Sequence, residues 1–391
     1  MTSLLFLTTI SVLSQSWQAA AAPTTESNAS RPCVDMLLSI PITANNSIYD
    51  IPQVDNNIDA VDYIWDLDHW SAPNSTERVK GARPVHETFA ISAQLCIPRD
   101  SSKAGILQIA THGLGFDKRY WDAELHPDKY SYVDAALNAG YSILTYDRLG
   151  VGHSDKPDAY EVVQVPVETE ILKELAVLAR AGALAEKASS IGVPSFDKIV
   201  LVGHSYGSSL TIAVLANYPS LVDGAVSTGL IPNAQFGAAG QRAFGLEYAP
   251  ASDPSRFGDR GSGYLVQGTE SSLQQIFFKK GFFEPELLKY ANGIKETGTA
   301  GELVSLPAAL AIPAAGFKGP ILFALAESDM ATCLGDCKGT YNLTTLRDKM
   351  FPRAGDVSVH LQPGSGHALT MHVNATGHYE VIFAYLGEHG L

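Results

Sequence analysis

Positive charge is scarce in this chain, because 27 Lys and Arg residues stand against 41 Asp and Glu residues and give a formal net charge of −14. Such a balance argues against nucleic acid and anionic membrane surfaces as partners, since both carry dense negative charge. Long apolar runs are missing too, and no stretch approaches the ~18 consecutive apolar residues of a transmembrane helix. The composition therefore predicts a protein that binds no nucleic acid and is not stably inserted in a membrane.

Internal repeats and nucleotide-binding motifs are also absent. Gly150-x-Gly152 lacks the third glycine of a dinucleotide fingerprint and leads into a polar loop instead of a helix. The C-x-x-x-C pair Cys333 and Cys337 has no second pair of metal ligands nearby. Neither a metal nor an organic cofactor is expected.

Cysteine is rare, since the chain has only four, and four cysteines allow three disulfide pairings. We expect Cys33 to pair with Cys96 and Cys333 to pair with Cys337. By loop entropy the longer loop would stabilise the fold by roughly 4 kcal/mol and the shorter one by roughly 2 kcal/mol. We therefore expect the shorter bridge mainly to hold the conformation of the loop that follows Asp329.

The first residues resemble a secretory signal peptide at 1–22. Residues 1–17 are apolar and rich in hydroxyl groups without an acid, and a run of alanines at 19–22 suits cleavage, although the segment has no Lys or Arg. Sequons for N-glycosylation agree with passage through the secretory route. They begin at Asn28, Asn45, Asn74, Asn342 and Asn374. We therefore expect a secreted glycoprotein with disulfide bonds.

The pattern G-x-S-x-G at residues 203–207 stands between an apolar run at 199–202 and a helix-like stretch at 210–217. A strand that ends and a helix that begins within so few residues force Ser205 into a strained turn, and the flanking glycines leave room for both backbones. The hydroxyl is then held out at the carboxyl edge of a sheet, with the amide of Tyr206 facing the point where an oxyanion would form. This geometry favours acyl transfer.

A second motif lies upstream, where the strand-like run 106–110 breaks into Thr-His-Gly-Leu-Gly at 111–115. A glycine-containing turn there can aim the amide of Leu114 at the same point as the amide of Tyr206. Each such donor stabilises the transition state of acyl transfer by roughly 3 kcal/mol. Leu114 and Tyr206 are therefore the predicted oxyanion hole.

A third motif, D-R-x-G-x-G-x-S at residues 147–154, follows another short apolar run. In this order and spacing, the three motifs resemble the α/β-hydrolase superfamily, in particular its lipase, esterase and peptidase-like branch with a serine nucleophile. The resemblance covers residues 85–391. It implies a mostly parallel central sheet flanked by helices, with a helical cap inserted after the sixth strand. It also implies that Asp147 and Arg148 are structural and tie the loop beneath the site.

A serine hydroxyl is a poor nucleophile at neutral pH, so it needs a base and a carboxylate that orients the base. In this superfamily the order along the chain is serine, acid, histidine. The first strong strand after the serine is 321–325, and Asp329 follows it at the position that matches the family best. Glu327 is the alternative, because Ala326 stands where family members usually carry glycine three residues before the acid.

His367 is the expected base. It ends the loop Pro-Gly-Ser-Gly-His at 363–367, which follows the last predicted strand at 357–361. The other histidines of this region lie within that strand or further on, in or near a helical segment. They are His360, His372, His378 and His389.

Strand-like and helix-like stretches alternate along the family region, as in a mostly parallel sheet covered by helices on both faces. We expect residues 85–229 and 319–391 to form this core. Residues 23–84 are expected to be an N-terminal extension packed on the core. Its first strand is expected at 47–51 and a helix-like piece at 64–70.

Residues 230–318 exceed what one helix and two loops require, so they are expected to form the cap over the nucleophile. Aromatic side chains gather in this segment. Phe282 and Phe283 are candidates for lining an apolar acyl pocket, and the alternative is that the rings form the cap's own core. The helical candidates are 271–278, 285–295 and 301–310.

Together, the motifs predict a secreted serine hydrolase that cleaves a small hydrophobic ester or lactone through an acyl-enzyme on Ser205. Alternatives on the same triad are a peptidase, an acyltransferase or a C–C hydrolase, including enzymes of natural-product metabolism. A peptidase acting on free N-termini would use cap acids such as Glu270, Glu284 or Glu286. The alternative of another class is a catalytically silent binding protein, against which the full set of triad candidates argues.

Overall fold

The structure is a computed structural model that describes residues 31–99, 101–192, 195–232, 240 and 242–391. The expected signal peptide at 1–22 and the sequon at Asn28 lie outside these residues. The fold described below is that of the compact unit Pro32–Leu391. In the described part of the chain, no helix is both long and apolar enough to cross a bilayer.

An eight-stranded sheet forms the centre, with the strand order β1-β2-β4-β3-β5-β6-β10-β11. The pairs β1 with β2 and β2 with β4 are antiparallel, whereas all the other neighbours are parallel. Strands β4 and β6 are buried along their whole length, as expected for strands covered on both faces. The strands are β1 Cys33–Tyr49, β2 Val79–Cys96, β3 Ile106–Thr111, β4 Ser142–Tyr146, β5 Lys198–His204, β6 Gly224–Thr228, β10 Pro320–Ala326 and β11 Asp356–Gln362.

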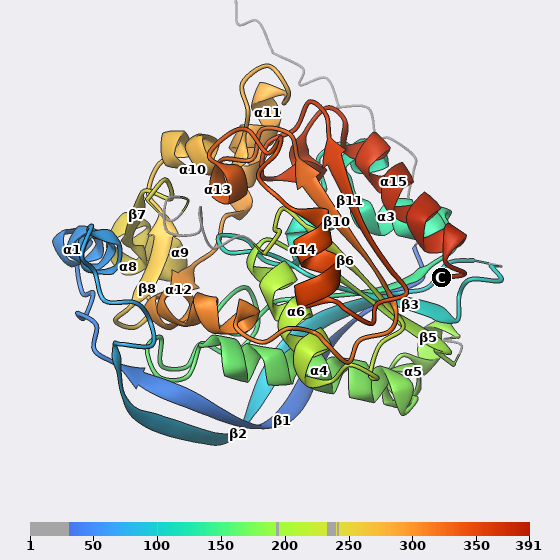
Figure 1. The fold of residues 1–391 in the computed structure, drawn as a ribbon, viewed down its shortest axis with the longest axis horizontal. Coiled ribbons are helices and arrows are strands. Elements are labelled where there is room, and N and C mark those ends of the chain that lie inside the picture. Colours follow the sequence, from blue (N-terminus) through green and yellow to red (C-terminus); the bar gives the residue numbers. More distant parts are fainter. Residues whose placement is uncertain (1–30, 100, 193–194, 233–239, 241) are drawn as a thin grey trace, which may run out of the picture. The chain divides into compact units, whose positions relative to one another are not determined.

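Helices cover both faces of the sheet (Figure 1), with α4 packed on α6 and α3 packed on α15. Helix α4 buries Ile171, Leu172 and Leu175 at helical spacing, which places one apolar stripe on the core. The predicted fold class, a mostly parallel sheet flanked by helices, is confirmed. Outside the segment between β6 and β10, the helices that follow β2 are α2 Pro127–Tyr130, α3 Tyr132–Asn138, α4 Val165–Arg180, α5 Ala183–Lys187, α6 Tyr206–Asn217, α13 Met330–Cys333, α14 Leu343–Thr345 and α15 Ala375–Glu388.

The N-terminal part of the unit is mostly sheet. Strand β1 is 17 residues long, and it pairs with β2 from Cys33 opposite Cys96 to Tyr49 opposite Val79. The predicted first strand at 47–51 was therefore wrong in its bounds, because the alternation of buried and exposed residues starts well before it. The helix-like piece is α1, Asn57–Asp68.

The segment between β6 and β10 contains both helices and strands. The helical candidates correspond to α10 Glu270–Phe277, α11 Pro285–Ile294 and α12 Ala300–Ser305 with the 3-10 turn Leu306–Leu310. The segment also contains a three-stranded sheet, β7-β8-β9, which was not predicted from the sequence. Its strands are Leu246–Tyr248, Tyr264–Gln267 and Gly298–Thr299. Two short helices, α8 Ala249–Ser252 and α9 Pro254–Phe257, connect β7 to β8.

Candidate active site

Ser205 lies in the sharp turn between β5 and α6, with φ 52° and ψ −114°. Both flanking glycines are needed for close approach. A Cβ on Gly203 would lie 2.5 Å from the Cα of Ser208, and a Cβ on Gly207 would lie 2.2 Å from the carbonyl oxygen of Thr111. Backbone atoms cannot yield as a flexible side chain does, so a larger residue at 203 would push α6 away from β5, and one at 207 would push α6 away from β3.

Ser205, His367 and Asp329 meet at the carboxyl ends of β5, β11 and β10. The Oγ of Ser205 lies 2.8 Å from Nε2 of His367, and Nδ1 of His367 lies 2.7 Å from Oδ2 of Asp329. Asp329 is fully buried and His367 nearly so. A serine, an imidazole and a carboxylate in this sequence form the arrangement that activates a hydroxyl for attack on a carbonyl.

The loop after β10 holds the carboxylate of Asp329 in place. Its Oδ1 accepts a hydrogen bond from the amide of Thr332 at 2.8 Å, so Asp329 caps α13 as well. Its backbone carbonyl accepts from the amides of Cys333 and Gly335. Glu327, the alternative acid, points elsewhere and pairs with Lys338 at 2.7 Å.

His372 shapes the loop that carries His367. Its Nδ1 donates to the carbonyl oxygen of Ala368 at 2.7 Å, and its Nε2 accepts from the amides of Gly366 at 2.9 Å and Lys279 at 3.3 Å. Burial lowers the pKa of His372 to about 4, so the ring is neutral and keeps this acceptor. His360, His378 and His389 make no hydrogen bond with Ser205 or Asp329 in the described part of the chain.

Two rings flank His367, those of Phe277 and His204, with centroids 5.6 Å and 4.9 Å away. His204 is stacked on Tyr120 at 4.3 Å. Burial lowers the pKa of His204 well below its usual value, and the neighbouring His367 adds to the effect. A neutral His204 places no positive charge beside His367.

The loop of the predicted oxyanion hole lies directly against Ser205. A Cβ on Gly113 would come within 3.0 Å of the Cβ of Ser205. Tyr206 is the first residue of α6, where amides have no partner within the helix and the helix dipole favours negative charge. Among the described residues, neither the amide of Leu114 nor that of Tyr206 donates to a backbone carbonyl. The oxyanion hole formed by the amides of Leu114 and Tyr206 stays a prediction, with which the position of this loop beside Ser205 agrees.

His112 fixes the same loop. Its Nδ1 donates to the carbonyl oxygen of Gly113 at 2.8 Å, and its Nε2 accepts from the amide of Arg148 at 3.1 Å. Burial, with the nearby charge of Arg148, lowers the pKa of His112 to about 3. The ring is therefore neutral, and one nitrogen donates while the other accepts.

A buried charge network lies beneath this loop. Arg148 contacts Glu168 at 2.5 Å and also Glu302. Its guanidinium lies 4.5 Å from the ring centre of Tyr206, whose hydroxyl donates to Glu168 at 2.7 Å. Burial raises the pKa of Glu168, and the charge of Glu302 adds to the rise while Arg148 opposes it. The network ties the cap helix α12 to the residue after Ser205.

Glu168 and Glu302 were not predicted from the sequence. Glu168 stands on the buried stripe of α4, three and four residues before Ile171 and Leu172. An acid on the apolar face of an amphipathic helix was a usable signal, because such a group is rarely buried without a partner. Glu302 gave a weaker signal, because it is the third residue after Thr299 in a helix capping box, and such a box accounts for a glutamate there without a buried partner.

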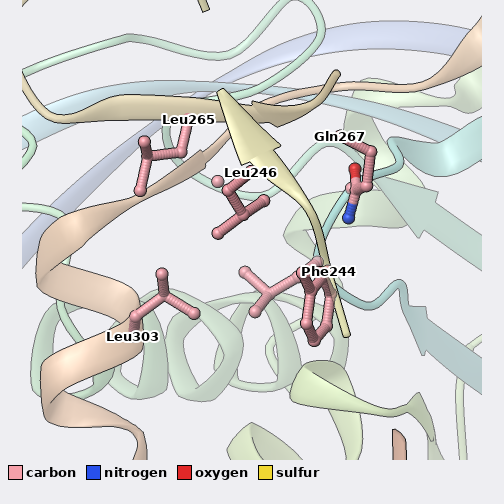
Figure 2. A pocket seen from close by; sticks show the side chains of 8 residues that line it. Phe244, Leu246, Leu265, Gln267 and Leu303 are labelled. Carbon is pink, nitrogen blue, oxygen red and sulfur yellow. The ribbon is translucent and has the colours of Figure 1, made fainter. Parts of the chain in front are cut away.

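Figure 2 shows the side chains around a small cavity beside the oxyanion loop. Leu114 and Gly115 line it from the core, and the cap segment contributes the rest of its wall. The cap side chains that Figure 2 labels are Phe244, Leu246, Leu265, Gln267 and Leu303.

Phe282 and Phe283, the predicted pocket residues, do not line this cavity. Phe283 packs on Phe278 and His372, with ring centres 5.1 Å and 6.4 Å apart. The carbonyl of Phe282 accepts from the amide of Val373 at 2.9 Å. These aromatic residues hold the histidine loop against the cap, and the cavity wall is mainly leucine.

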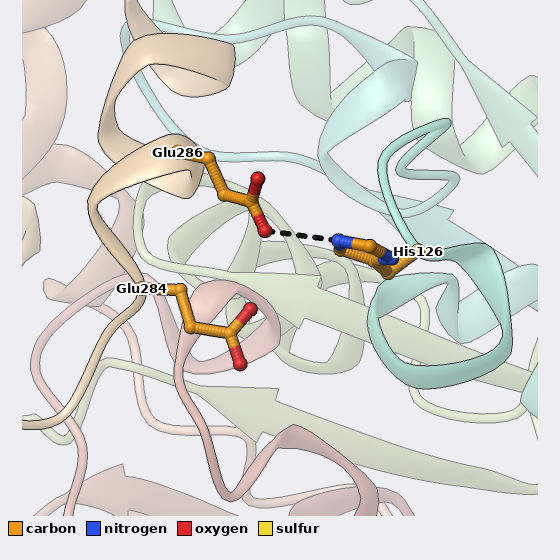
Figure 3. Close-up of side chains that lie close together, drawn as sticks. All are labelled: His126, Glu284 and Glu286. Carbon is orange, nitrogen blue, oxygen red and sulfur yellow. Dashed lines mark hydrogen bonds and ion pairs between the residues drawn. The ribbon is translucent and has the colours of Figure 1, made fainter. Parts of the chain in front are cut away.

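A second group of ligand-type side chains lies at the surface, where atoms of His126, Glu284 and Glu286 are within 4.8 Å of one another. Figure 3 shows His126 facing Glu286, and Nε2 lies 2.9 Å from Oε1. Lys129 already places its ammonium 2.8 Å from Glu284. These contacts join α2 to the start of α11, and Glu270 is exposed at the start of α10.

The four cysteines pair as predicted, Cys33 with Cys96 and Cys333 with Cys337. The second bridge follows Asp329 directly, within the loop that holds the carboxylate. Three of the sequon asparagines are exposed, namely Asn45, Asn74 and Asn342. Asn374 is partly buried and donates to the carbonyl of Pro363, close to the histidine loop.

Comparison with known proteins gives the family. The model described as "Alpha/beta hydrolase family" matches residues 109–376. A proline iminopeptidase of Saccharolobus solfataricus is 36% identical over 94 residues, which are 24% of this chain and 26% of that protein. A soluble monoglyceride lipase variant from Saccharomyces cerevisiae, in complex with a substrate analog, has a TM-score of 0.51 at 14% identity, covering 77% of this chain and 92% of that chain.

The curated relatives match only in part, because the chain spans 26% to 38% of their length. The likeness to the lipase structure is a likeness of fold, since the sequence identity is low. The family model, in contrast, spans both the serine turn and the histidine loop and matches more than half of the chain. This chain belongs to the alpha/beta hydrolase family.

Proposed function

We propose that this protein is a serine hydrolase that cleaves a small hydrophobic carboxylic ester or lactone. One observation carries the proposal: the Oγ of Ser205 is 2.8 Å from Nε2 of His367, whose Nδ1 is 2.7 Å from Asp329. The complete triad argues against the silent binding protein, because a protein that only binds has no need for an activated hydroxyl.

The reaction would proceed in two steps, acylation of Ser205 and hydrolysis of the acyl-enzyme. The Oγ of Ser205 attacks the carbonyl carbon while Nε2 of His367 takes the hydroxyl proton, and the resulting oxyanion accepts from the amides of Leu114 and Tyr206. The bond to the alcohol then breaks, and His367 passes the proton to the leaving oxygen. Water repeats the attack on the acyl-enzyme, which frees the acid and restores Ser205.

An ester is favoured over a peptide with a free N-terminus. Binding an amine would call for a cap acid that faces the substrate, and two of the three candidates are already paired. Glu284 pairs with Lys129 and Glu286 with His126 on the outer surface. The side chains that surround Leu114 and Gly115 are mainly apolar, which supports an apolar substrate in preference to a charged amine.

The test is labelling with a fluorophosphonate, which reacts with activated serines. The wild-type protein should be labelled, and Ser205→Ala and His367→Ala should lose the labelling. Ser271→Ala is the matched control, because Ser271 is an exposed serine of the cap segment and should not affect labelling. Equal labelling of wild type and Ser205→Ala would refute the proposal.

We also propose that the protein is secreted and glycosylated. Two disulfides support this, since such bonds persist in oxidising compartments. Exposed sequons at Asn45, Asn74 and Asn342 support it too. Expression in a eukaryotic host should give protein in the medium whose mass falls on treatment with an N-glycosidase. Full retention inside the cell would contradict the proposal.

A further inference from the structure

Arg148 contacts both halves of the predicted oxyanion hole. Its guanidinium donates to the carbonyl oxygen of Gly113 at 3.5 Å, and its own amide donates to Nε2 of His112 at 3.1 Å. On the other side, the guanidinium lies 4.5 Å from the ring centre of Tyr206. One side chain therefore spans the two segments that carry the predicted donor amides, those of Leu114 and Tyr206.

The hydrogen bond to Gly113 bears on the amide of Leu114, because both groups belong to one peptide unit. A trans peptide is planar, and its carbonyl and N–H point in opposite directions. The carbonyl of Gly113 accepts from Arg148 and also from Nδ1 of His112, the latter at 2.8 Å. Holding that carbonyl therefore fixes the direction of the Leu114 N–H.

Two buried carboxylates hold the guanidinium in this place. Glu168 of α4 contacts Nη1 at 2.5 Å, and Glu302 of α12 contacts the same nitrogen. The second oxygen of Glu168 accepts from the hydroxyl of Tyr206 at 2.7 Å. The second oxygen of Glu302 accepts from the amide of Thr299 at 2.7 Å. The guanidinium and both carboxylates are at most 2% exposed, so their partners within the protein set their positions.

This network does not act on the triad directly. In the described part of the chain, neither carboxylate forms a hydrogen bond with Ser205, His367 or Asp329. A buried set of charges is also weak evidence for stability, since well-packed apolar residues of similar volume are often as stable. Orientation of the two amides explains the acids better, because both amides lie on groups that the network holds.

Resting on the function proposed above, we infer that Glu168 and Glu302 are positioning residues for ester hydrolysis. Through Arg148 and the hydroxyl of Tyr206, they hold the two donor amides at the separation that an oxyanion requires. Since Glu302 belongs to the cap helix α12, the oxyanion hole keeps this geometry only while α12 lies on Arg148. A misplacement of about 1 Å in such a site can cost ~100-fold in rate, so small shifts of these side chains suffice.

Tyr206→Phe tests the contribution of Glu168, because it removes the hydroxyl that Glu168 binds and keeps the backbone amide. With 4-nitrophenyl butanoate as substrate, kcat should fall by about 10-fold, while KM should stay within about twofold of the wild-type value. The split arises because the oxyanion forms in the transition states of both steps and not in the bound ester.

Glu302→Gln tests the contribution of the cap. Glutamine keeps an oxygen that can accept from the amide of Thr299, but it lacks the charge that holds Arg148. Here kcat should fall by about 10- to 100-fold with little change in KM. The inhibition constant of butyl trifluoromethyl ketone should rise by the same factor, because its adduct with Ser205 carries an oxyanion that needs the same amides. Tyr206→Phe keeps the inference testable should Glu302→Gln fail to fold.

Tyr132→Phe is the matched control. Tyr132 is a buried tyrosine whose hydroxyl donates to Gln108 at 2.7 Å, so this variant loses an equivalent hydrogen bond. Its kcat and its inhibition constant should equal those of the wild type, which a merely structural role of the other hydroxyl would not distinguish.

Wild-type kcat and inhibition constant in either folded variant, Tyr206→Phe or Glu302→Gln, would overturn the inference. An equal fall of kcat in Tyr132→Phe would overturn it as well. Fluorophosphonate labelling of the same preparations separates this failure from that of the proposed function. Labelling and turnover by the wild type with no effect of the variants would refute only the inference, whereas a wild type without labelling or turnover would refute both.

Discussion

Asp329 and Glu327 are two residues apart in the chain, yet they lie in different environments. Asp329 is fully buried, accepts from the amide of Thr332, and lies 2.7 Å from His367. Glu327 is near the surface and pairs with Lys338. Only Asp329 is placed to hold the imidazole in the tautomer and orientation that a base requires.

Exchange of each acid for its amide tests this assignment. Asp329→Asn should lower kcat on an ester by about 10⁴-fold, because the amide no longer stabilises the protonated imidazole. Glu327→Gln should leave kcat close to that of the wild type and serves as the control. A large loss in Glu327→Gln with a small one in Asp329→Asn would exchange the two roles.

Short motifs with fixed spacing predicted Ser205, His367 and Asp329, which the structure brings together. The role of His372 as the acceptor for two amides was not predictable, because one of those amides, Lys279, belongs to the distant cap segment. Partners that are far apart in the chain leave no local pattern.

At the scale of elements, the histidine loop and the cap are joined by backbone pairing. The amide of Ala368 donates to the carbonyl of Phe277 at 3.0 Å, and that of Val373 donates to the carbonyl of Phe282 at 2.9 Å. His372 adds its own hydrogen bonds between these two points. The position of His367 therefore depends on the end of α10 and the turn after it.

Replacement of His372 tests this coupling. His372→Leu should lower the free energy of unfolding by about 1–3 kcal/mol, because the buried amide of Gly366 loses its acceptor. The rate of fluorophosphonate labelling should fall with it, since His367 is then less well held. Chemical denaturation and labelling kinetics measure the two effects, with the exposed His153→Leu as control. Unchanged stability and labelling would show that the loop does not depend on His372.

Element prediction succeeded where buried residues repeat over several turns or along a whole strand. The stripe of α4 and the apolar run of β5 are such cases. It failed for β7 and β9, which have 3 and 2 residues, because periodicity needs a longer window. Strand β1 was underestimated because its residues 44–47 are Ala-Asn-Asn-Ser, which have low strand propensity.

At the scale of the whole molecule, four buried histidines whose pKa values are lowered make folding sensitive to acid. Burial lowers the pKa of His112 and of His378 to about 3 and that of His372 to about 4, and it lowers the pKa of His204 well below the usual value. In the unfolded chain these groups bind protons below pH ~6.5. Stability should therefore be highest above that pH and fall as the pH drops toward 4, because the unfolded state then binds more protons. Glu168, whose raised pKa acts in the opposite sense, offsets part of the effect.

His378 provides a direct test of this pH dependence, because both of its ring nitrogens are buried without a partner in the described part of the chain. Between pH 4.5 and 6, His378→Leu should reduce the slope of unfolding free energy against pH by about 1.4 kcal/mol per pH unit, the value for one proton. Urea denaturation over this range measures the slope. The exposed His153→Leu should keep the wild-type slope, and an unchanged slope in His378→Leu would contradict the account.

The sheet, the cap and the loops together hold one serine against one imidazole, and the central claim is that this serine carries the acyl group during turnover. The most direct measurement is mass spectrometry of protein quenched with acid during hydrolysis of 4-nitrophenyl butanoate. We predict one added butanoyl group, located by peptide mapping on Ser205, and none in Ser205→Ala. Turnover of the ester with no acyl group on Ser205, or with the group on another residue, would contradict the claim.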